Sequence, residues 1–171
     1  GEALDSLRYM AAERNAMIAV VTELPTVRCD RVRMAEVFQN LLSNALKFAN
    51  GRPPVVRIGG EDAGAAYRFW VSDNGPGVPE PHRQRVFQIF QRLHGPSEEG
   101  TGVGLTICKK IVESHGGRIW VEPSEEGGAR FCFTLPKDLQ NAPAGDGPSP
   151  EDASPARADK GKRTCPIPQS C

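Results

Sequence analysis

The sequence predicts an α/β protein, a two-layer sandwich in which helices cover one face of a mixed β-sheet. The first observation is the order of patterns along the chain: helix, strand, helix, two strands, two helices, two strands. Because strands follow one another in pairs, this order differs from the strand–helix alternation of a parallel sheet. The second observation is the composition, 39% hydrophobic and 25% charged with zero formal net charge, which is typical of one soluble domain.

The helices are predicted from apolar residues at helical spacing. Residues 1–16 carry a weak pattern of this kind. Residues 30–49 carry the clearest one, and it begins at Asp30, whose side chain can cap a helix N-terminus. We also expect a short helix over residues 81–93 and a longer one over 106–115, which two glycines end.

The strands are predicted from runs of β-branched and aromatic residues bounded by turn residues. Five segments have this character: 18–24, 55–61, 65–73, 118–122 and 129–136. A turn joins the second segment to the third, and another turn joins the last two. The sheet is therefore expected to contain consecutive strands.

A change of composition near the last strand sets the domain limits. Seven of the 15 prolines lie in residues 136–171, where large apolar residues are almost absent. Such a segment buries too little surface to fold, so we expect residues 137–171 to be a disordered tail. We expect one folded domain over residues 17–136, and residues 1–16 to be the stub of a preceding helical linker.

Several classes of function find no support in the composition. No apolar run is long enough to span a membrane, and the N-terminus has no signal-peptide pattern. The balanced charge gives no reason to expect a nucleic acid or a membrane surface as a partner. The five cysteines suit neither a disulfide framework nor a zinc site. Cys108 and Cys132 are expected to be buried thiols, and the compartment is expected to be reducing and cytoplasmic.

The stretch GTGVGLTICKK, residues 100–110, is the first candidate site. Its glycines let backbone N–H groups approach an anion where a helix begins. It is not a P-loop, because no Lys and Ser/Thr follow Gly100. It is not a dinucleotide fingerprint either, because the third glycine is missing. Alone, the stretch leaves a phosphate site and an ordinary loop-to-helix junction equally open.

The long helix over residues 30–49 carries a second candidate group. Four polar residues share one of its faces, opposite the apolar stripe. They are Glu36, Asn40, Asn44 and Lys47. Amide oxygens there could bind Mg²⁺, which takes oxygen ligands, and the lysine could face phosphate. The alternative is a solvated outer face.

A third group is DNGPGVP, residues 73–79. Asp73 ends a strand, where its carboxylate could accept a hydrogen bond from an amino group of a ligand. Gly75 and Gly77 would let a ring lie close to the backbone. The alternative is an ordinary turn, because Asn–Gly and Pro–Gly pairs mark turns readily.

Taken together, four motifs carry a resemblance to a known family. FQNLLSNALKF, DNGPGVP, VFQIFQRL and GTGVGLTICKKIVESHGG follow one another over about 80 residues. They resemble the N, G1, F and G2 boxes of the catalytic ATP-binding domain of sensor histidine kinases. That domain belongs to the GHKL superfamily, which includes DNA gyrase, mismatch-repair and chaperone ATPases and has the Bergerat-type two-layer fold. The resemblance covers residues 17–136, and FQRLHG is most similar to the phytochrome-type branch.

The resemblance implies roles for residues at the base of the nucleotide. Asp73 matches the aspartate that receives the adenine amino group. Gly75 and Gly77 match the glycines that shape the adenine pocket, and Phe48 matches an aromatic residue beside the base. Arg130 departs from the family, because many relatives place Ser or Thr at Ala129–Arg130, near the adenine.

The resemblance also implies how the phosphates are held. Asn44 matches the Mg²⁺-binding asparagine, Asn40 the polar residue one turn earlier, and Lys47 a basic residue near the phosphates. The glycine-rich stretch matches the edge of a mobile ATP lid that meets the phosphates. Its ATP-binding residues are Gly100, Thr101, Gly102, Gly104 and Leu105, with Arg92 approaching phosphate from the lid. Phe87 and Phe90 match phenylalanines that anchor the lid.

The implied activity is that of a kinase using ATP and Mg²⁺. Asn40 stands where gyrase-type relatives place a water-activating glutamate, and an amide cannot act as a general base. The site is therefore expected to hold Mg·ATP without hydrolysing it fast. His82, His94 and His115 lack the context of a phosphoacceptor and read as surface or capping residues. We expect the acceptor histidine on a separate dimerisation segment, with a response regulator as an indirect partner.

Two other functions remain open at this point. One is a non-catalytic nucleotide-binding adaptor of the same fold, against which the complete set of site residues argues. The other is an anti-sigma-type serine kinase, against which the phytochrome-like lid argues.

Overall fold

The computed structural model describes residues 2–49, 51–88 and 103–137. Three helices, five strands and two short 3₁₀ helices form within these ranges. In chain order they are α1 (Glu2–Glu13), β1 (Met17–Val20), α2 (Arg31–Lys47), β2 (Val55–Asp62), β3 (Ala66–Asp73), η1 (Glu80–His82), η2 (Arg85–Phe87), α3 (Gly104–Ser114), β4 (Ile119–Pro123) and β5 (Ala129–Pro136).

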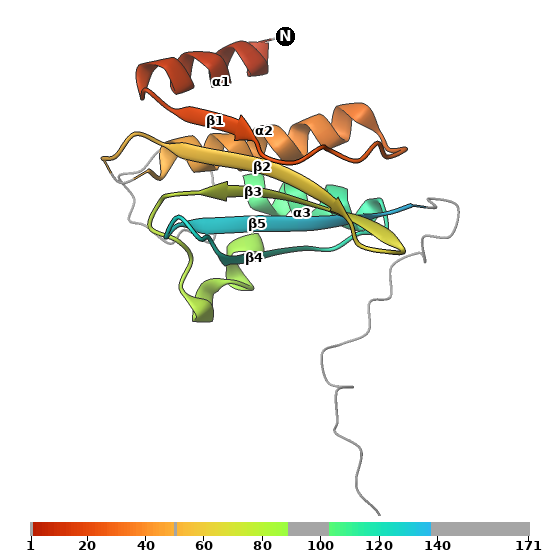
Figure 1. The fold of residues 1–171 in the computed structure, drawn as a ribbon. Coiled ribbons are helices and arrows are strands. Elements are labelled where there is room, and N and C mark those ends of the chain that lie inside the picture. The colour runs from red at the N-terminus through yellow and green to blue at the C-terminus, as the bar shows by residue number, and fades with distance from the viewer. Residues whose placement is uncertain (1, 50, 89–102, 138–171) are drawn as a thin grey trace, which may run out of the picture.

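The strands form one mixed sheet in the order β1-β2-β3-β5-β4. Strand β1 pairs with β2 in parallel, and every other neighbouring pair is antiparallel. The strands lie in front of α2 and α3 in Figure 1, and the view turned by 90° separates a sheet layer from a helix layer. The predicted two-layer α/β sandwich is confirmed.

Helix α2 begins and packs as its sequence predicts. The Asp30 carboxylate accepts hydrogen bonds from the N–H groups of Val32 (2.9 Å) and Arg33 (3.1 Å), which the first turn leaves without helical partners. The apolar stripe faces the sheet, and Val37 and Leu41 are fully buried. This packing fixes which face of α2 the polar residues occupy.

Aromatic rings fill the centre of the core between the two layers. Phe133 stacks on Phe69 with ring centroids 5.4 Å apart, and Phe38 of α2 meets Phe133 edge-on at 5.5 Å. Cys108 and Cys132 are both fully buried, so the prediction of buried thiols is confirmed.

Helix α1 packs on α2 and contributes Leu7 to the core. At its C-terminal end Arg14 donates hydrogen bonds to the carbonyl oxygens of Leu46 (2.8 Å) and Lys47 (2.9 Å). These carbonyls belong to the last turn of α2, where helical partners are missing. Residues 1–16, predicted as a linker stub, thus include a helix that is joined to the folded unit.

Two predicted elements differ from the structure. The helix expected over 81–93 is replaced, up to residue 88, by the short 3₁₀ helices η1 and η2, because Gln88 is extended and ends the second one. The strand expected over 18–24 ends at Val20. Beyond it the Thr22 hydroxyl, instead of a backbone ladder, bonds to the backbone of Gly60.

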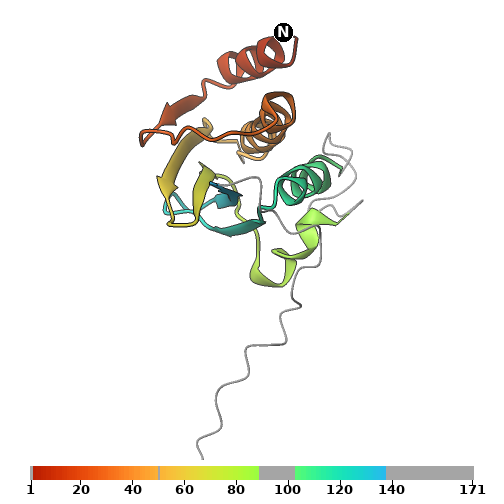
Figure 2. The same cartoon turned by 90° about the vertical axis from the view of Figure 1, so that its right-hand side faces the viewer.

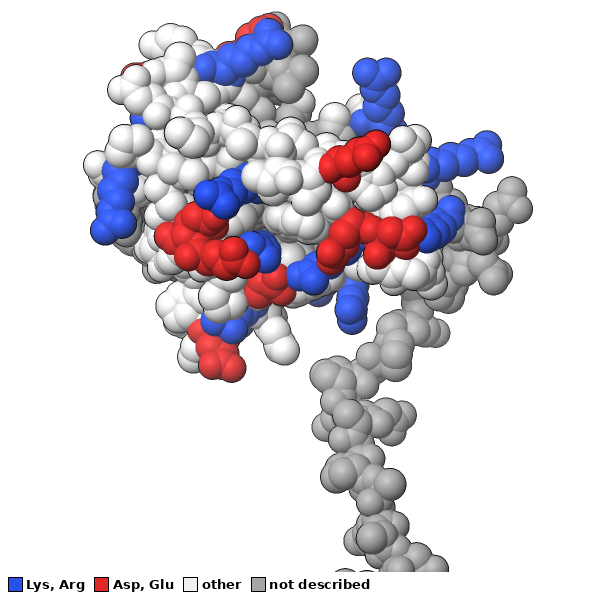
Figure 3. All heavy atoms as spheres, in the orientation of Figure 1, with Lys and Arg blue, Asp and Glu red and all other residues white. Residues whose placement is uncertain are grey.

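The face of the sheet that lies away from the helices is polar. Figure 3 shows Lys and Arg interspersed with Asp and Glu over the sheet. The charges pair across strands, as in Arg68 with Glu122 (2.7 Å) and Arg57 with Glu126 (3.0 Å). Among the described residues, no helix is long and apolar enough to cross a membrane.

Candidate nucleotide site

Asp73 lies at the C-terminal end of β3, on the same side of the sheet as the core residues Phe69 and Val71. Only 8% of the residue is exposed. Its Oδ1 accepts hydrogen bonds from the backbone N–H groups of Gly75 (2.9 Å) and Ala129 (3.1 Å). Neither bond uses Oδ2. The carboxylate is therefore held by the backbone on one oxygen, with a second oxygen for a ligand.

Burial raises the pKa of the Asp73 carboxyl, because the charged form loses hydration. The two backbone N–H donors act in the opposite direction, and the negative charge of Glu126 adds to the increase. A carboxylate kept nearly dry in this way interacts more strongly with a donor from a ligand than an exposed one does.

Three glycines bring the backbone of three segments against Asp73. A Cβ on Gly75 would lie 2.5 Å from the carbonyl oxygen of Phe48, at the end of α2. Gly77 has φ +74°, and a Cβ there would lie 3.1 Å from the carbonyl oxygen of Gly128. A Cβ on Gly128 would lie 2.2 Å from the carbonyl oxygen of Asp73. The end of α2, the β3–η1 loop and the β4–β5 turn thus meet at this site.

Gly128 had no predicted role at the site, and Ala129 was placed near the adenine only through the resemblance, without a role for its backbone N–H. In the sequence, the pair Gly127–Gly128 indicates a turn and nothing more. Ala129 contributes its backbone N–H, which no side-chain pattern marks. Arg130, which raised a question about base recognition, points to the other face of the sheet, because its neighbour Phe131 faces the core. Its side chain pairs there with Glu122 and Glu125.

The polar face of α2 is partly buried. Asn40, Asn44 and Lys47 are all partly covered. The Asn40 amide donates to the carbonyl oxygen of Glu36 (3.0 Å), and a Cβ on Gly104 would lie 2.8 Å from Asn40 Oδ1. The face of α2 that carries Asn40 therefore adjoins the N-terminus of α3, and the first N–H groups of a helix lack intrahelical partners and can bind an anion.

Helix α3 begins at Gly104, two residues earlier than predicted, and Leu105 packs against the edge of the core. The Thr106 hydroxyl donates to the carbonyl oxygen of Phe87 (3.1 Å). Phe87 is itself buried and meets Phe131 edge-on with ring centroids 6.3 Å apart. Phe87 thus contacts the start of α3 through its carbonyl oxygen, while the lid that it is predicted to anchor lies outside the described residues.

Several predicted site residues lie outside the described residues. They are Phe90, Arg92, Gly100, Thr101 and Gly102, together with His94 and the tail. The described part of the site therefore consists of the base end around Asp73, the polar face of α2 and the start of α3.

His115 joins two helices. Its Nδ1 lies 2.7 Å from the carbonyl oxygen of Ile111, and its Nε2 accepts a hydrogen bond from the N–H of Asp30 (3.2 Å). The ring therefore links the C-terminal end of α3 to the N-cap of α2, in agreement with its interpretation as a capping histidine.

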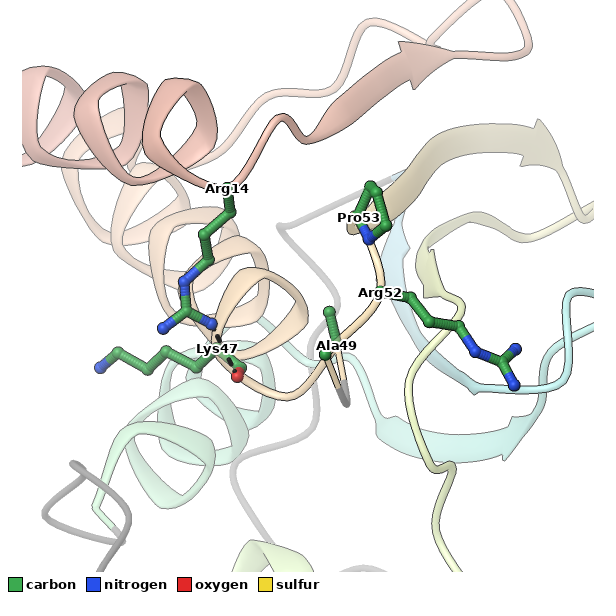
Figure 4. A pocket seen from close by; sticks show the side chains of 6 residues that line it. Arg14, Lys47, Ala49, Arg52 and Pro53 are labelled. Carbon is green, nitrogen blue, oxygen red and sulfur yellow. Dashed lines mark hydrogen bonds between the residues drawn. The ribbon is translucent and has the colours of Figure 1, made fainter.

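A pocket at the C-terminal end of α2 contains only one of the predicted site residues, Lys47. Its lining residues are Arg14, Lys47, Ala49, Gly51, Arg52 and Pro53. In Figure 4 the side chains of Lys47 and Arg52 point in different directions, and Arg14 reaches toward the carbonyl oxygen at the end of α2. Asp73 is not among these lining residues, so this pocket is distinct from the site around Asp73.

The fold and these residues together define the class of the protein: a GHKL-type domain, as in sensor histidine kinases. The chain belongs to the family described as histidine kinase-, DNA gyrase B- and HSP90-like ATPase, whose model matches residues 29–139. This membership confirms the resemblance that the four sequence motifs carry.

Curated relatives include cyanobacterial phytochromes. The chain is 46% identical over 136 residues to cyanobacterial phytochrome A of Nostoc sp. and 43% identical over 136 residues to the phytochrome-like protein Cph1 of Synechocystis sp.. Each alignment covers 79% of this chain but 18% of the relative. The chain thus spans about a fifth of the length of these proteins.

Solved histidine kinase domains share the fold. The catalytic domain of the histidine kinase ThkA superposes with a TM-score of 0.69 at 33% identity, covering 81% of this chain and 90% of that one. ThkA has also been solved in complex with the response regulator protein TrrA, and that structure matches with a TM-score of 0.65 at 30% identity, covering 82% of this chain and 40% of that one.

Proposed function

We propose that this domain binds Mg·ATP between Asp73 and the polar face of α2, and donates the γ-phosphate to a protein histidine outside these 171 residues. The observation that carries the proposal is the buried Asp73 carboxylate, held on Oδ1 by two backbone N–H groups where three glycine-lined segments meet. Membership in a family of histidine kinase domains supports the reaction class.

The base end suits adenine. The N6 amino group of adenine is a hydrogen-bond donor, and Oδ2 of Asp73, which neither backbone N–H uses, is an acceptor. Guanine would present its O6 carbonyl at the same place, so that two acceptors would face each other without a proton between them. A buried polar group left unpaired in this way is costly, and the site should therefore prefer ATP to GTP.

The polar face of α2 and the start of α3, here called the phosphate end, suit a metal that is bound mainly through the nucleotide. Mg²⁺ commonly keeps several waters and takes few protein ligands besides substrate phosphates. The side-chain amide of Asn44, a half-buried residue, would supply one oxygen ligand of this kind. Bound Mg²⁺ would neutralise negative charge on the phosphates. Lys47 and the free N–H groups at the start of α3 would add positive potential on the same side.

One turn of α2 before Asn44 stands the amide of Asn40, where a carboxylate could have activated water. The Asn40 amide is engaged with the Glu36 carbonyl oxygen through Nδ2 and faces Gly104 with Oδ1. An amide does not take up a proton at neutral pH, so hydrolysis should be slow. The domain would position the γ-phosphate, and the attacking nitrogen would come from the histidine of a partner segment.

Because this domain would supply the phosphoryl group and another segment the accepting histidine, the proposal implies two partners. The acceptor histidine is expected on a dimerisation segment, and a response regulator would then receive the phosphoryl group. The complex of the related ThkA with TrrA supports a partner of this kind. A cytoplasmic location is part of the same proposal.

Phosphotransfer to a separately supplied acceptor tests the proposal. The chain is mixed with the helical phosphoacceptor segment of a phytochrome-type kinase and with ATP labelled at the γ-phosphate. We expect label on the acceptor in an acid-labile, base-stable linkage, as a phosphohistidine gives. Two controls accompany the test: an acceptor with His→Gln should give no label, and the chain with Asp73→Asn should give much less label than the parent at the same low ATP concentration. Acid-stable label on serine would instead identify a serine kinase, and ATP binding without transfer would favour an adaptor.

A further inference from the structure

A polar cluster lies directly behind Asp73, on the face of the sheet away from the helices. It consists of Ser72, Ser124, Glu126 and Arg57. Ser72 and Ser124 are almost fully buried, with 1% and 8% of each residue exposed. The cluster joins β3, β2 and the β4–β5 turn, and none of its side chains faces the nucleotide.

The Glu126 carboxylate holds the cluster together. Its Oε2 accepts from the Ser124 hydroxyl (2.6 Å) and lies 3.1 Å from the Ser72 hydroxyl, and its Oε1 pairs with Arg57 (3.0 Å). The two hydroxyl oxygens are 2.7 Å apart. Each serine has one proton, so at least one of the two hydroxyls donates to the carboxylate, and the other donates to the carboxylate or to its neighbouring hydroxyl. Hydrogen bonds to an ionised acceptor are the stronger kind.

The cluster acts on the same turn that supplies Asp73 with a donor. The Ser124 N–H donates to the carbonyl oxygen of Gly128 (2.9 Å), which closes the turn. Gly128 then lies against the backbone of Asp73, and the N–H of Ala129 donates to Asp73 Oδ1. Ser72 is the residue before Asp73 in the chain. Glu126 therefore connects strand β3, through Ser72, to the β4–β5 turn, through Ser124. These are the two segments that hold the Asp73 carboxylate in place.

We propose that Glu126 is a positioning residue for base recognition: through Ser72 and Ser124 it holds the β4–β5 turn against β3, so that Asp73 keeps one oxygen bonded and presents the other to adenine. This inference rests on the proposed function for its ligand, but the geometry it describes belongs to the free protein. Glu126 touches no ligand in this account. Its effect reaches the nucleotide only through Asp73.

The test compares two ligands on the full chain by calorimetry: Mg·ATP, and Mg·tripolyphosphate, which lacks the base. We expect Glu126→Ala to weaken ATP binding about tenfold, the scale of one lost charged hydrogen bond, and to leave tripolyphosphate binding unchanged. Glu126→Gln keeps a carbonyl oxygen for the serines and should restore most of the ATP affinity. Glu125→Ala is the matched control, because Glu125 is the neighbouring carboxylate with 82% of its side chain exposed, and it should change neither affinity.

A purely structural role would give a different result. Equal losses for both ligands, or no loss for either, would overturn the inference. If Glu126→Ala does not fold, Ser124→Ala removes one of the same hydrogen bonds with a smaller change and is expected to show the same difference between the ligands.

Amide hydrogen exchange separates this inference from the proposed function. In the ligand-free chain, the Ala129 and Gly75 amides should exchange faster in Glu126→Ala than in the parent, while amides in the middle of β5 keep their rates. Unchanged Ala129 exchange would contradict the positioning role, whatever the protein binds. A parent chain that binds neither ligand but shows the expected exchange would contradict the proposed function alone.

Discussion

The two ends of the candidate site are built in different ways. At the base end, Asp73 is buried and bonded by two backbone N–H groups, and the glycines around it leave no space for a Cβ. At the phosphate end, Asn40, Asn44 and Lys47 are half-buried side chains on one helix. The base end is therefore formed before a ligand arrives, whereas the phosphate end leaves room for a metal and for the nucleotide to complete it. The base end should decide which nucleotide binds, and the phosphate end how strongly Mg²⁺ contributes.

The largest effect is expected for Asp73→Asn. The new carbonyl oxygen can still accept both backbone hydrogen bonds, because both use Oδ1, but an NH₂ group then replaces Oδ2. A donor would face the adenine amino group, and we expect ATP affinity to fall about 10- to 100-fold. Calorimetric titration measures the loss. Asp62→Asn, an exposed carboxylate at the other end of the β2–β3 hairpin, should leave ATP affinity unchanged.

Gly128→Ala should distort the base end of the site by a steric clash. The added Cβ would meet the backbone of Asp73 and Gly75, which cannot rotate away as a flexible side chain would. We expect a loss of unfolding free energy of about 1–3 kcal/mol and about tenfold weaker ATP binding. Denaturant unfolding and titration measure the two effects. Gly127→Ala is the control. Its Cβ would meet open space, but φ is +88°, so backbone strain alone should lower the free energy of unfolding by about 1–2 kcal/mol and leave ATP affinity unchanged.

Asn44→Ala should affect the phosphate end and depend on the metal. Removing the amide oxygen would take away the proposed Mg²⁺ ligand, so we expect ATP affinity to fall about fivefold with Mg²⁺ present. With the metal chelated, parent and variant should bind ATP equally. Ser43→Ala, one position earlier on α2, serves as the control. An equal loss with and without Mg²⁺ would show that Asn44 acts on the nucleotide directly.

The smallest expected effect is on the pH dependence of stability. The raised pKa of Asp73 means that the folded protein binds a proton more readily there than the unfolded chain does. The contribution of Asp73 to the free energy of unfolding is thus fully present below its ordinary value of 3.8 and is lost as pH rises through the folded pKa. Asp73→Asn should therefore be more stable than the parent at neutral pH, and this difference should shrink toward pH 4. Thermal unfolding at several pH values tests it, and a variant less stable at pH 7 would contradict it.

Features of local sequence predicted most of the described fold. The cap at Asp30, the apolar stripe of α2 and the paired strands all depend on neighbouring residues, and each was confirmed. Up to residue 88 the helix expected over 81–93 was wrong, because the periodic residues Val86 and Phe87 are buried from a 3₁₀ helix. Periodicity alone does not distinguish a continuous helix from short turns that bury the same side chains.

The sequence predicted those parts of the candidate site that consist of recognisable side chains and glycines. It did not predict the parts that consist of backbone groups. Asp73, Gly75 and Gly77 stand in a recognisable motif. Gly128 and the N–H of Ala129 reach Asp73 only because β5 pairs with β3, a contact across more than 50 residues that no local pattern contains. The cluster around Glu126 depends on the same long-range pairing.

The most direct test of the central claim is a calorimetric titration of this chain with Mg·ATP and with Mg·GTP, while ATP consumption is followed in the same sample. The account predicts that ATP binds, that GTP binds at least tenfold more weakly because O6 would face Asp73, and that ATP is consumed hardly at all. Equal affinity for the two nucleotides, or no binding of ATP, would contradict base recognition by Asp73. Rapid steady consumption would contradict the claim that a nucleophile must come from a partner.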